Sequence, residues 1–159
     1  MFKILTALIL QLSVLIGQNC MSKAQADSLI HYAKKYLGTR YKYASIDPKL
    51  GFDCSGFTCY VFQKFGFKVP RSSIEYEKFG KNVAKDSAKP GDIIVFRGTN
   101  LKNKRAGHVG IVVITENNDV TFIHSSSNKT RGGVILSNFK DSPYYEKRFI
   151  RICRFDDCQ

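Results

Sequence analysis

The stretch Gly51-Phe52-Asp53-Cys54-Ser55-Gly56-Phe57 (GFDCSGF) decides the fold, because an irregular segment ends there and a helix begins. Residues 39–52 hold turn formers without hydrophobic periodicity, and we predict a loop there. From Cys54 to about Phe65 apolar residues recur at helical spacing, and Asp53 is a favourable N-cap residue. The sequence therefore predicts a helix that carries a thiol in its first turn.

The position of Cys54 is typical of a nucleophile. A first-turn cysteine faces the positive end of the helix dipole and free backbone N–H groups. Such thiols can have a pKa of about 3.5–7.5, and the same N–H groups can bind an oxyanion. The charge of Asp53 would raise this pKa, unless the carboxylate caps the helix or binds a substrate cation. The alternative is that Cys54 belongs to the core.

Further helices are predicted around this one, and strands after it. Ser22 to Gln25 has the form of a capping box for a helix that ends near Gly38, and a short helix is expected from Ser72. The later part of the chain favours strands over residues 92–96, 108–114, 120–124, 133–136 and 145–155. Helices followed by strands indicate an α+β domain, with N-terminal helices packed on an antiparallel β-sheet or half-barrel.

Two histidines fall on neighbouring strands of this sheet, whereas His31 lies on the polar side of the first helix. A five-residue loop over residues 115–119 pairs Val112 with Phe122 and Ile114 with Val120, and it places His108 and His124 on one face. A two-residue loop at residues 117–118 would place them on opposite faces. We prefer the five-residue loop because it matches large apolar partners.

Cys54, His108 and His124 together predict a catalytic site. A helix-start thiol, a general base and a group that orients the base are the components of cysteine-based nucleophilic catalysis. Each residue alone has an ordinary structural explanation, as a core cysteine or a strand histidine with satisfied hydrogen bonds. Their combination favours function over those explanations.

The N-terminus predicts export. Lys3 precedes an apolar run from Ile4 to Ile16, which is too short to span a bilayer and is typical of a secretory signal peptide. We expect residues 1–19 to be removed and residues 20–159 to form a single domain without a transmembrane anchor, in the periplasm, cell envelope or extracellular space. A buried first helix and a lipoprotein with lipidated Cys20 are the alternatives.

Composition and charge restrict the partners. The chain has 159 residues, 43% of them apolar, and a net charge of +12. Basic residues are dispersed rather than gathered in one helix, so for an exported protein we expect anionic envelope polymers rather than nucleic acid. The five cysteines are at positions 20, 54, 59, 153 and 158, without metal-ligand spacing, and we predict no metal and no cofactor.

Six motifs carry a resemblance to a known family. In chain order they are YLG with Tyr41, FDCSGF, VPRSS, KPGDIIVF, GHVGIVV and FIHSSS, within about residues 24–155. Because the six motifs occur in this order, the chain resembles the NlpC/P60 family of cell-wall cysteine peptidases. The resemblance implies a papain-like α+β fold and hydrolysis of amide bonds in peptidoglycan stem peptides, most often the γ-D-glutamyl bond to diaminopimelate or lysine. The partner would be peptidoglycan or a muropeptide, and we expect a monomer.

The resemblance also implies roles for single residues. Cys54 would be the nucleophile, His108 the base and then the acid for the leaving amine, and His124 the orienting third member. Tyr41 would polarise the scissile carbonyl. Asp53 and Ser55 would receive the free α-amine of the substrate, and that ammonium would offset the effect of Asp53 on the thiolate.

The chain departs from the family where Arg40 replaces a common proline and Ala44-Ser45 replaces a small glycine pair. A strongly basic segment over residues 97–106 is a further peculiarity. Two other functions remain open. One is an amidase or acyltransferase on the same scaffold, and the other is a catalytically silent basic protein that binds the envelope.

Overall fold

The computed structural model describes residues 21–116 and 119–155. The predicted signal peptide, Cys20 and Cys158 lie outside these residues. Within the described ranges, no helix combines the length and the hydrophobicity needed to cross a membrane.

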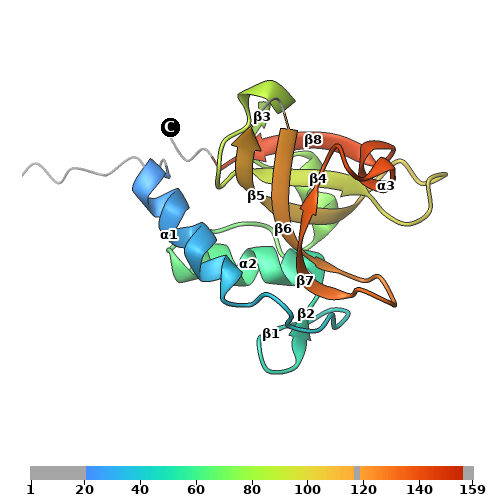
Figure 1. Ribbon diagram of the computed structural model, residues 1–159, viewed down its shortest axis with the longest axis horizontal. Coiled ribbons are helices and arrows are strands. Elements are labelled where there is room, and N and C mark those ends of the chain that lie inside the picture. Colours follow the sequence, from blue (N-terminus) through green and yellow to red (C-terminus); the bar gives the residue numbers. More distant parts are fainter. Residues whose placement is uncertain (1–20, 117–118, 156–159) are drawn as a thin grey trace, which may run out of the picture.

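Two α-helices pack side by side against one face of the sheet (Figure 1). α1 (Lys23–Lys34) begins with the predicted capping box: Gln25 N–H donates to Ser22 Oγ, and Ser22 N–H donates to Gln25 Oε1. α2 (Cys54–Lys64) begins after Asp53, whose side chain accepts from Gly56 N–H at 2.6 Å. Both predicted helix starts are therefore confirmed, and the thiol of Cys54 lies in the first turn of α2.

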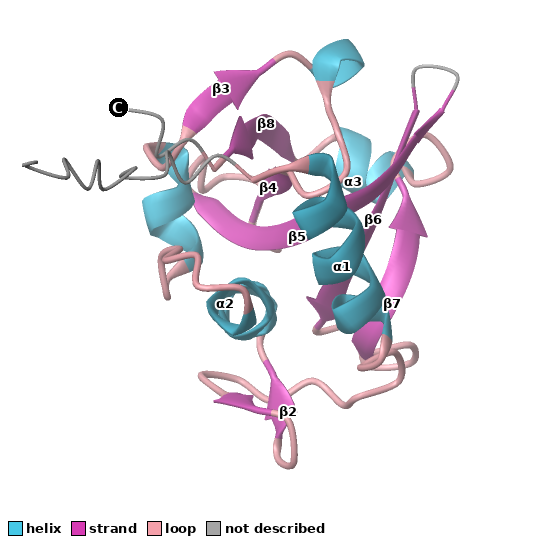
Figure 2. Cartoon of the chain, turned by 90° about the vertical axis from the view of Figure 1, so that its left-hand side faces the viewer, coloured by secondary structure: helices cyan, strands magenta, loops and turns pink. Residues whose placement is uncertain are grey.

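The strands form an antiparallel sheet. In the part of the chain that the structure describes it has six strands in the order β3-β8-β4-β5-β6-β7. Their bounds are β3 Lys81–Val83, β4 Ile93–Arg97, β5 Ala106–Glu116, β6 Asp119–Ser126, β7 Gly133–Asn138 and β8 Phe149–Arg154. β5 is long and curved and passes beside α2 (Figure 2). The predicted α+β class, with helices on an antiparallel sheet, is confirmed.

Each face of the sheet has its own apolar core. One core lies between the helices and the side chains of Val95, Val109 and Ile111, which are fully buried. The other lies on the opposite face around Phe96 and Phe122. Successive strand residues point to opposite faces, so Val109 faces the helices whereas its neighbour His108 faces the second core, 6.0 Å between ring centroids from Phe96.

Some elements differ from the prediction. Residues 39–52 contain a small hairpin, β1 (Ile46–Asp47) and β2 (Gly51–Phe52). The helix expected from Ser72 is the 3₁₀ helix η1 (Ser73–Glu77), and a second one, η2, covers Lys85–Ser87. The strand expected from Tyr145 begins only at Phe149, because Pro143 starts a short helix, α3 (Pro143–Glu146).

The β5–β6 hairpin also differs from the predicted register. Ile111 pairs with Ile123 and Val112 with Phe122, as expected. Beyond Val112, however, Ile114 pairs with Thr121 and Glu116 pairs with Asp119, so only residues 117–118 separate the strands. The prediction of a five-residue loop over residues 115–119 was therefore wrong. A β-bulge at Val113 adds one residue to β5, and this shift keeps His108 and His124 on one face despite the shorter connection.

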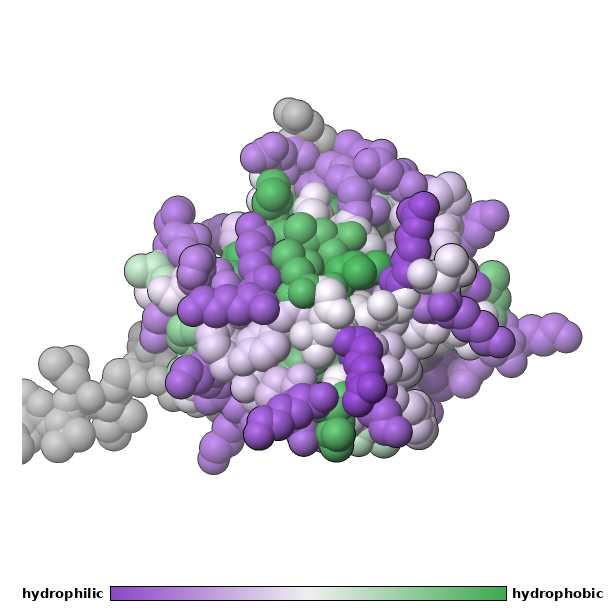
Figure 3. Space-filling view, turned by 60° about the horizontal axis from the view of Figure 1, so that its bottom comes forward, coloured by the Kyte–Doolittle hydropathy of each residue, from purple (hydrophilic) through white to green (hydrophobic). Residues whose placement is uncertain are grey.

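Hydrophilic side chains are scattered around a central apolar area on the face shown in Figure 3. The basic residues of the molecule are correspondingly dispersed over several elements and loops. No single basic helix dominates the described chain.

Candidate active site

Cys54 lies against the backbone of β5 on both sides of His108. Its Sγ is 3.9 Å from the carbonyl oxygen of Gly107, and the N–H of Val109 also faces the sulfur. The side chain is buried, with 8% of the residue exposed. Cys54 and Gly107, 53 positions apart in sequence, bring the start of α2 and the start of the β5 backbone together at the thiol.

The protonation of this thiol differs from the expectation. Burial raises the pKa of Cys54 above its ordinary value, and the charge of Asp53 raises it further. The N–H groups of Val109, Ser55 and Cys54 itself lower it, but they do not offset the loss of water. The thiol is therefore neutral at neutral pH and needs a base to become a nucleophile.

His108, the predicted base, lies in a chain of hydrogen-bonded side chains. His108 Nε2 is 2.8 Å from His124 Nδ1, and His124 Nε2 is 2.9 Å from Ser137 Oγ. Tyr145 Oη is 3.4 Å from the same Nε2. His124 is fully buried, so this chain runs from the half-buried His108 through the second core to β7 and α3.

Both imidazoles are held neutral. Burial lowers the pKa of His108 to about 4, and burial together with the neighbouring His108 lowers the pKa of His124 well below its ordinary value. A neutral imidazole has one donor nitrogen and one acceptor nitrogen. If His108 Nε2 donates to His124 Nδ1, then His124 Nε2 donates to Ser137 and His108 Nδ1 is left as the basic atom. This tautomer is the one that general-base catalysis requires.

Asp53 and Ser55 are engaged by a residue that was not predicted for the site. Arg71 donates to both carboxylate oxygens of Asp53, from Nη2 to Oδ2 at 2.6 Å and from Nη1 to Oδ1 at 3.0 Å. Its Nη1 also donates to Ser55 Oγ at 3.2 Å. The cation that Asp53 faces in the free protein is thus Arg71, and a substrate ammonium would have to join it or displace it.

Tyr41 lies next to the thiol. Burial raises the pKa of its hydroxyl, and the nearby charges of Cys54 and Asp53 raise it further. A bridge between Tyr41 and Phe52 aligns the two segments, and Ser125 Oγ donates to the carbonyl oxygen of Phe52 at 2.7 Å. The segment before Cys54 is therefore fixed to β6, the strand that carries His124.

The departure at residues 44–45 has a visible cost. Ala44 has a φ of +54°, which is the left-handed region where glycine is unstrained. Ser45 carries the carbonyl that a side chain at Gly56 would strike, which explains the glycine that follows Asp53, Cys54 and Ser55. The packing of this loop on α2 thus depends on a missing side chain at position 56.

The six predicted site residues gather in one region. His108 and His124 are in direct contact, Cys54 touches the backbone beside His108, and Tyr41 lies near Cys54. Sequence reasoning missed the contacts of Arg71, Ser137 and Tyr145. The VPRSS motif contains Arg71 and was a usable signal, but nothing in the sequence marked the two hydroxyl groups.

Residues 38–154 match the model of the NlpC/P60 family, and the chain belongs to this family. The predicted resemblance is confirmed.

Several curated relatives are similar to the chain. It is 35% identical over 131 residues to a γ-DL-glutamyl hydrolase of Bacillus subtilis, covering 80% of this chain and 30% of the relative. It is 34% identical over 140 residues to a probable endopeptidase of Haemophilus influenzae, with coverages of 87% and 78%. It is 37% identical over 113 residues to the Escherichia coli murein DD-endopeptidase MepS/murein LD-carboxypeptidase, with coverages of 70% and 53%. The chain thus spans about a third to about three quarters of these relatives.

Solved structures share the fold. An NlpC/P60 family protein from Bacillus cereus superposes with a TM-score of 0.70 at 29% identity, over 82% of this chain and 40% of the other. NlpC2 from Trichomonas vaginalis gives 0.69 at 27% identity, over 82% and 46%. The papain-like NlpC/P60 architecture predicted from the sequence is therefore confirmed.

Proposed function

We propose that the chain is an exported cysteine endopeptidase that hydrolyses peptidoglycan stem peptides, at the γ-D-glutamyl bond to diaminopimelate or lysine. The observation that carries this proposal is the 2.8 Å contact between His108 and His124 beside the helix-start thiol of Cys54. The names of the similar proteins, which include a γ-DL-glutamyl hydrolase and a murein DD-endopeptidase, support the substrate class.

The first step forms an acyl-enzyme. His108 Nδ1 takes the thiol proton of Cys54, and the thiolate attacks the γ-carbonyl carbon of D-glutamate. The N–H groups at the start of α2 and the hydroxyl of Tyr41 stabilise the oxyanion. His108 then gives the proton to the leaving amine, and the C–N bond breaks.

The second step restores the enzyme. Water loses a proton to His108 and attacks the thioester, and the peptide acid leaves as Cys54 regains its proton. Throughout both steps His124 keeps His108 in one orientation, because its Nδ1 accepts from His108 Nε2 and its Nε2 is fixed by Ser137. No charged third member is required, since the cation on His108 exists only transiently.

Export remains part of this proposal, with residues 1–19 as signal peptide and residues 20–159 as the mature catalytic domain. The intact mass of the secreted protein would show where cleavage occurs. A mass increase at Cys20 that corresponds to acyl chains would establish the lipoprotein alternative instead.

The experiment that tests the activity uses residues 20–159 under mild reductant. L-Ala-γ-D-Glu-diaminopimelate and its N-acetylated form are each incubated with the protein and with Cys54→Ala, and the products are followed by mass. We expect cleavage that disappears in the variant. Failure of a folded protein with a reduced Cys54 to cleave either peptide would contradict the proposal and leave the envelope-binding interpretation.

One observation favours a second candidate. Because Arg71 already occupies both oxygens of Asp53, a site without a free-amine requirement is also consistent with the geometry. Such an enzyme would cleave the acetylated peptide, or act as an amidase or acyltransferase on intact wall. Equal cleavage of free and acetylated peptides would support this candidate, whereas cleavage of the free peptide alone would return the amine-binding role to Asp53 and Ser55.

A further inference from the structure

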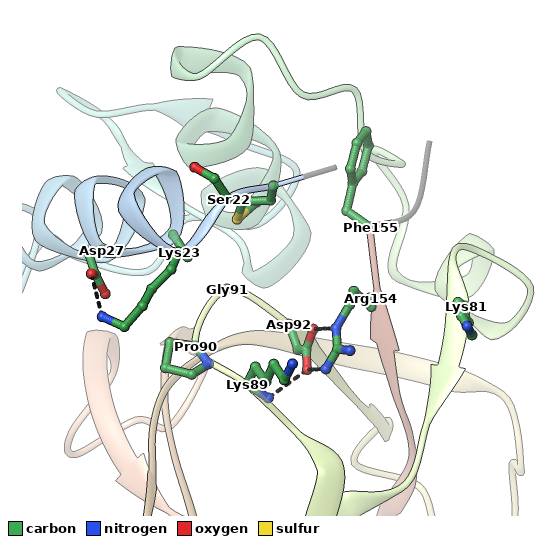
Figure 4. A pocket seen from close by; sticks show the side chains of 12 residues that line it. Ser22, Lys23, Asp27, Lys81, Lys89, Pro90, Gly91, Asp92, Arg154 and Phe155 are labelled. Atoms are coloured by element: carbon green, nitrogen blue, oxygen red, sulfur yellow. Dashed lines mark hydrogen bonds and ion pairs between the residues drawn. The ribbon is translucent and has the colours of Figure 1, made fainter. Parts of the chain in front are cut away.

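Two cavities of the described chain were candidates for a further site. The larger, of about 620 Å³, lies between the N-terminal end of α1 and the turn before β4 (Figure 4). Its Arg154 is paired with Asp92, and its Lys23 with Asp27. Met21 and Phe155, the two ends of the described chain, form part of its wall. These residues do not indicate a particular ligand for this cavity.

The second cavity, of about 470 Å³, opens beside His108. It is formed by the ends of β4 and β5, the segment between β6 and β7, and α3. Its lining includes Arg97 and Arg131 and several hydroxyl groups, and no Asp or Glu. Among lining residues of the described chain, positive charge is therefore not balanced by any carboxylate, and an anionic ligand suits the cavity.

Arg97 gives a stronger indication of an anionic ligand. Its Nε is buried and has no hydrogen-bond partner among the described residues, which is also true of Arg148 Nε, but only Arg97 lines the cavity. A buried donor without an acceptor is costly, and a carboxylate that accepts from a guanidinium removes this cost with strong, charge-assisted bonds. The side chain of Arg131 is exposed at the same cavity and adds a second cation.

Arg148 packs behind the wall of the cavity. Arg148 lies 3.7 Å above the ring of Tyr144 and donates to the carbonyl oxygens of Tyr144 and Thr99, at 3.2 Å each. The N–H of Arg97 in turn donates to the carbonyl oxygen of Arg148 at 2.7 Å. Arg148 thus has a structural role, whereas Arg97 and Arg131 remain available to a ligand.

In the proposed mechanism the cavity lies on the amine side of the scissile bond. The imidazole that protonates a leaving amine must touch it, so the residue that carries the amine passes His108. Asp53, Ser55 and Arg71, the groups for the acyl half of the substrate, do not line this cavity. Its occupant is therefore the leaving residue and not the glutamyl residue.

We propose that Arg97 and Arg131 bind a carboxylate on the leaving residue, and that the chain therefore prefers diaminopimelate to lysine at the third position of the stem peptide. This inference rests on the proposed function. The two amino acids share the leaving amine and the main chain, but only diaminopimelate ends its side chain in an extra carboxylate. One arginine–carboxylate contact should change kcat/KM by about tenfold to a hundredfold.

The test compares L-Ala-γ-D-Glu-meso-diaminopimelate with L-Ala-γ-D-Glu-L-Lys. We expect wild type to favour the first by at least about tenfold, and Arg131→Ala and Arg97→Gln to lose this preference through the diaminopimelate substrate alone. Lys102→Ala is the control, because Lys102 is an exposed cation of the loop between β4 and β5 and does not line the cavity. Equal activity of wild type on both peptides would overturn the inference, as would an equal loss on both in the arginine variants.

A binding measurement separates this inference from the proposed function. Calorimetry with Cys54→Ala, and with Cys54→Ala/Arg131→Ala, uses the dipeptides meso-diaminopimelate-D-Ala and L-Lys-D-Ala as probes. Tighter binding of the diaminopimelate dipeptide that requires Arg131 supports the carboxylate site even if wild type cleaves neither tripeptide. Cleavage without this difference in binding would retain the peptidase and reject the site.

Discussion

Arg71 holds Asp53 by both carboxylate oxygens, at 2.6 and 3.0 Å, directly beside Cys54, the proposed nucleophile. The same carboxylate caps α2 through Gly56 N–H and raises the pKa of the Cys54 thiol. Arg71 is therefore the group that balances the charge of Asp53. Its position explains how an acidic residue can stand next to a thiol that we propose to ionise.

Removal of Arg71 should make the thiol less reactive. In Arg71→Ala the unpaired Asp53 would raise the pKa of Cys54 further, so iodoacetamide should alkylate Cys54 more slowly at pH 7 and reach half-maximal rate at a higher pH than in wild type. Arg105→Ala is the control, since Arg105 also forms an ion pair, with Glu77, but an exposed one. An unchanged alkylation profile in Arg71→Ala would show that Arg71 does not act on the thiol.

Loss of the groups behind His124 should lower kcat with little change in KM. Ser137→Ala removes the 2.9 Å partner of His124 Nε2, and Tyr145→Phe removes the hydroxyl at 3.4 Å. Each single variant should retain much of the activity because the other hydroxyl remains, and the double variant should lose roughly tenfold in kcat, the equivalent of one lost hydrogen bond. Steady-state kinetics over a range of pH checks this. A change in KM alone would assign both hydroxyls to substrate binding.

Stability should fall in acid because of the buried histidines. The pKa of His108 is lowered to about 4 in the folded chain, whereas an unfolded histidine titrates near about 6.5. The unfolded state therefore binds more protons between these values, and the stabilisation present above about pH 6.5 is lost as the pH falls towards about 4. For His108 the loss is up to about 3 kcal/mol.

Urea unfolding between pH 7.5 and 4 measures this loss. The double variant His108→Asn/His124→Asn should show a flatter dependence on pH than wild type, while His31→Gln, on the exposed face of α1, should follow wild type. Parallel curves for wild type and the double variant would mean that the histidines are not the source of the acid sensitivity.

A methyl group at Gly110 should disturb the site through packing. A Cβ there would lie 2.8 Å from the Phe122 ring and 3.1 Å from His124 Cβ, closer than packed atoms tolerate. Gly110→Ala should cost about 1–3 kcal/mol in unfolding free energy and reduce kcat by displacing His124. Gly38→Ala is the comparison for backbone strain without a steric clash, since Gly38 has no neighbour within 4 Å but a φ of +85°. A stable, fully active Gly110→Ala would show that Phe122 and the hairpin backbone can move to make room for the methyl group.

Local signals predicted much of the fold. The capping box at Ser22 and the N-cap at Asp53 set the starts of both helices, because these side chains satisfy backbone donors within three residues. The strands that carry the histidines were likewise visible as apolar runs. Where the outcome depends on a few local groups, the sequence is sufficient.

Long-range contacts were less predictable. The ion pair between Arg71 and Asp53 joins residues 18 positions apart, and the contact between Ser137 and His124 depends on the register of β7 against β6. Burial also reversed the predicted pKa of Cys54, since the dipole of α2 is visible in the sequence whereas the loss of water around the thiol is not. The two short strands of residues 46–52 follow from contacts with each other and carry no periodic signal.

The bulge at Val113 determines whether His108 and His124 lie on the same face of the sheet. Side chains alternate along a strand, so a change of one residue between the histidines would send one of them to the opposite face of the sheet. Variants of this hairpin should therefore remain active when two residues are inserted or deleted between the histidines. They should also remain active when a one-residue deletion is combined with a one-residue insertion. Deletion of Val113 alone would leave Cys54, His108 and His124 in the protein, but the two histidines could no longer meet.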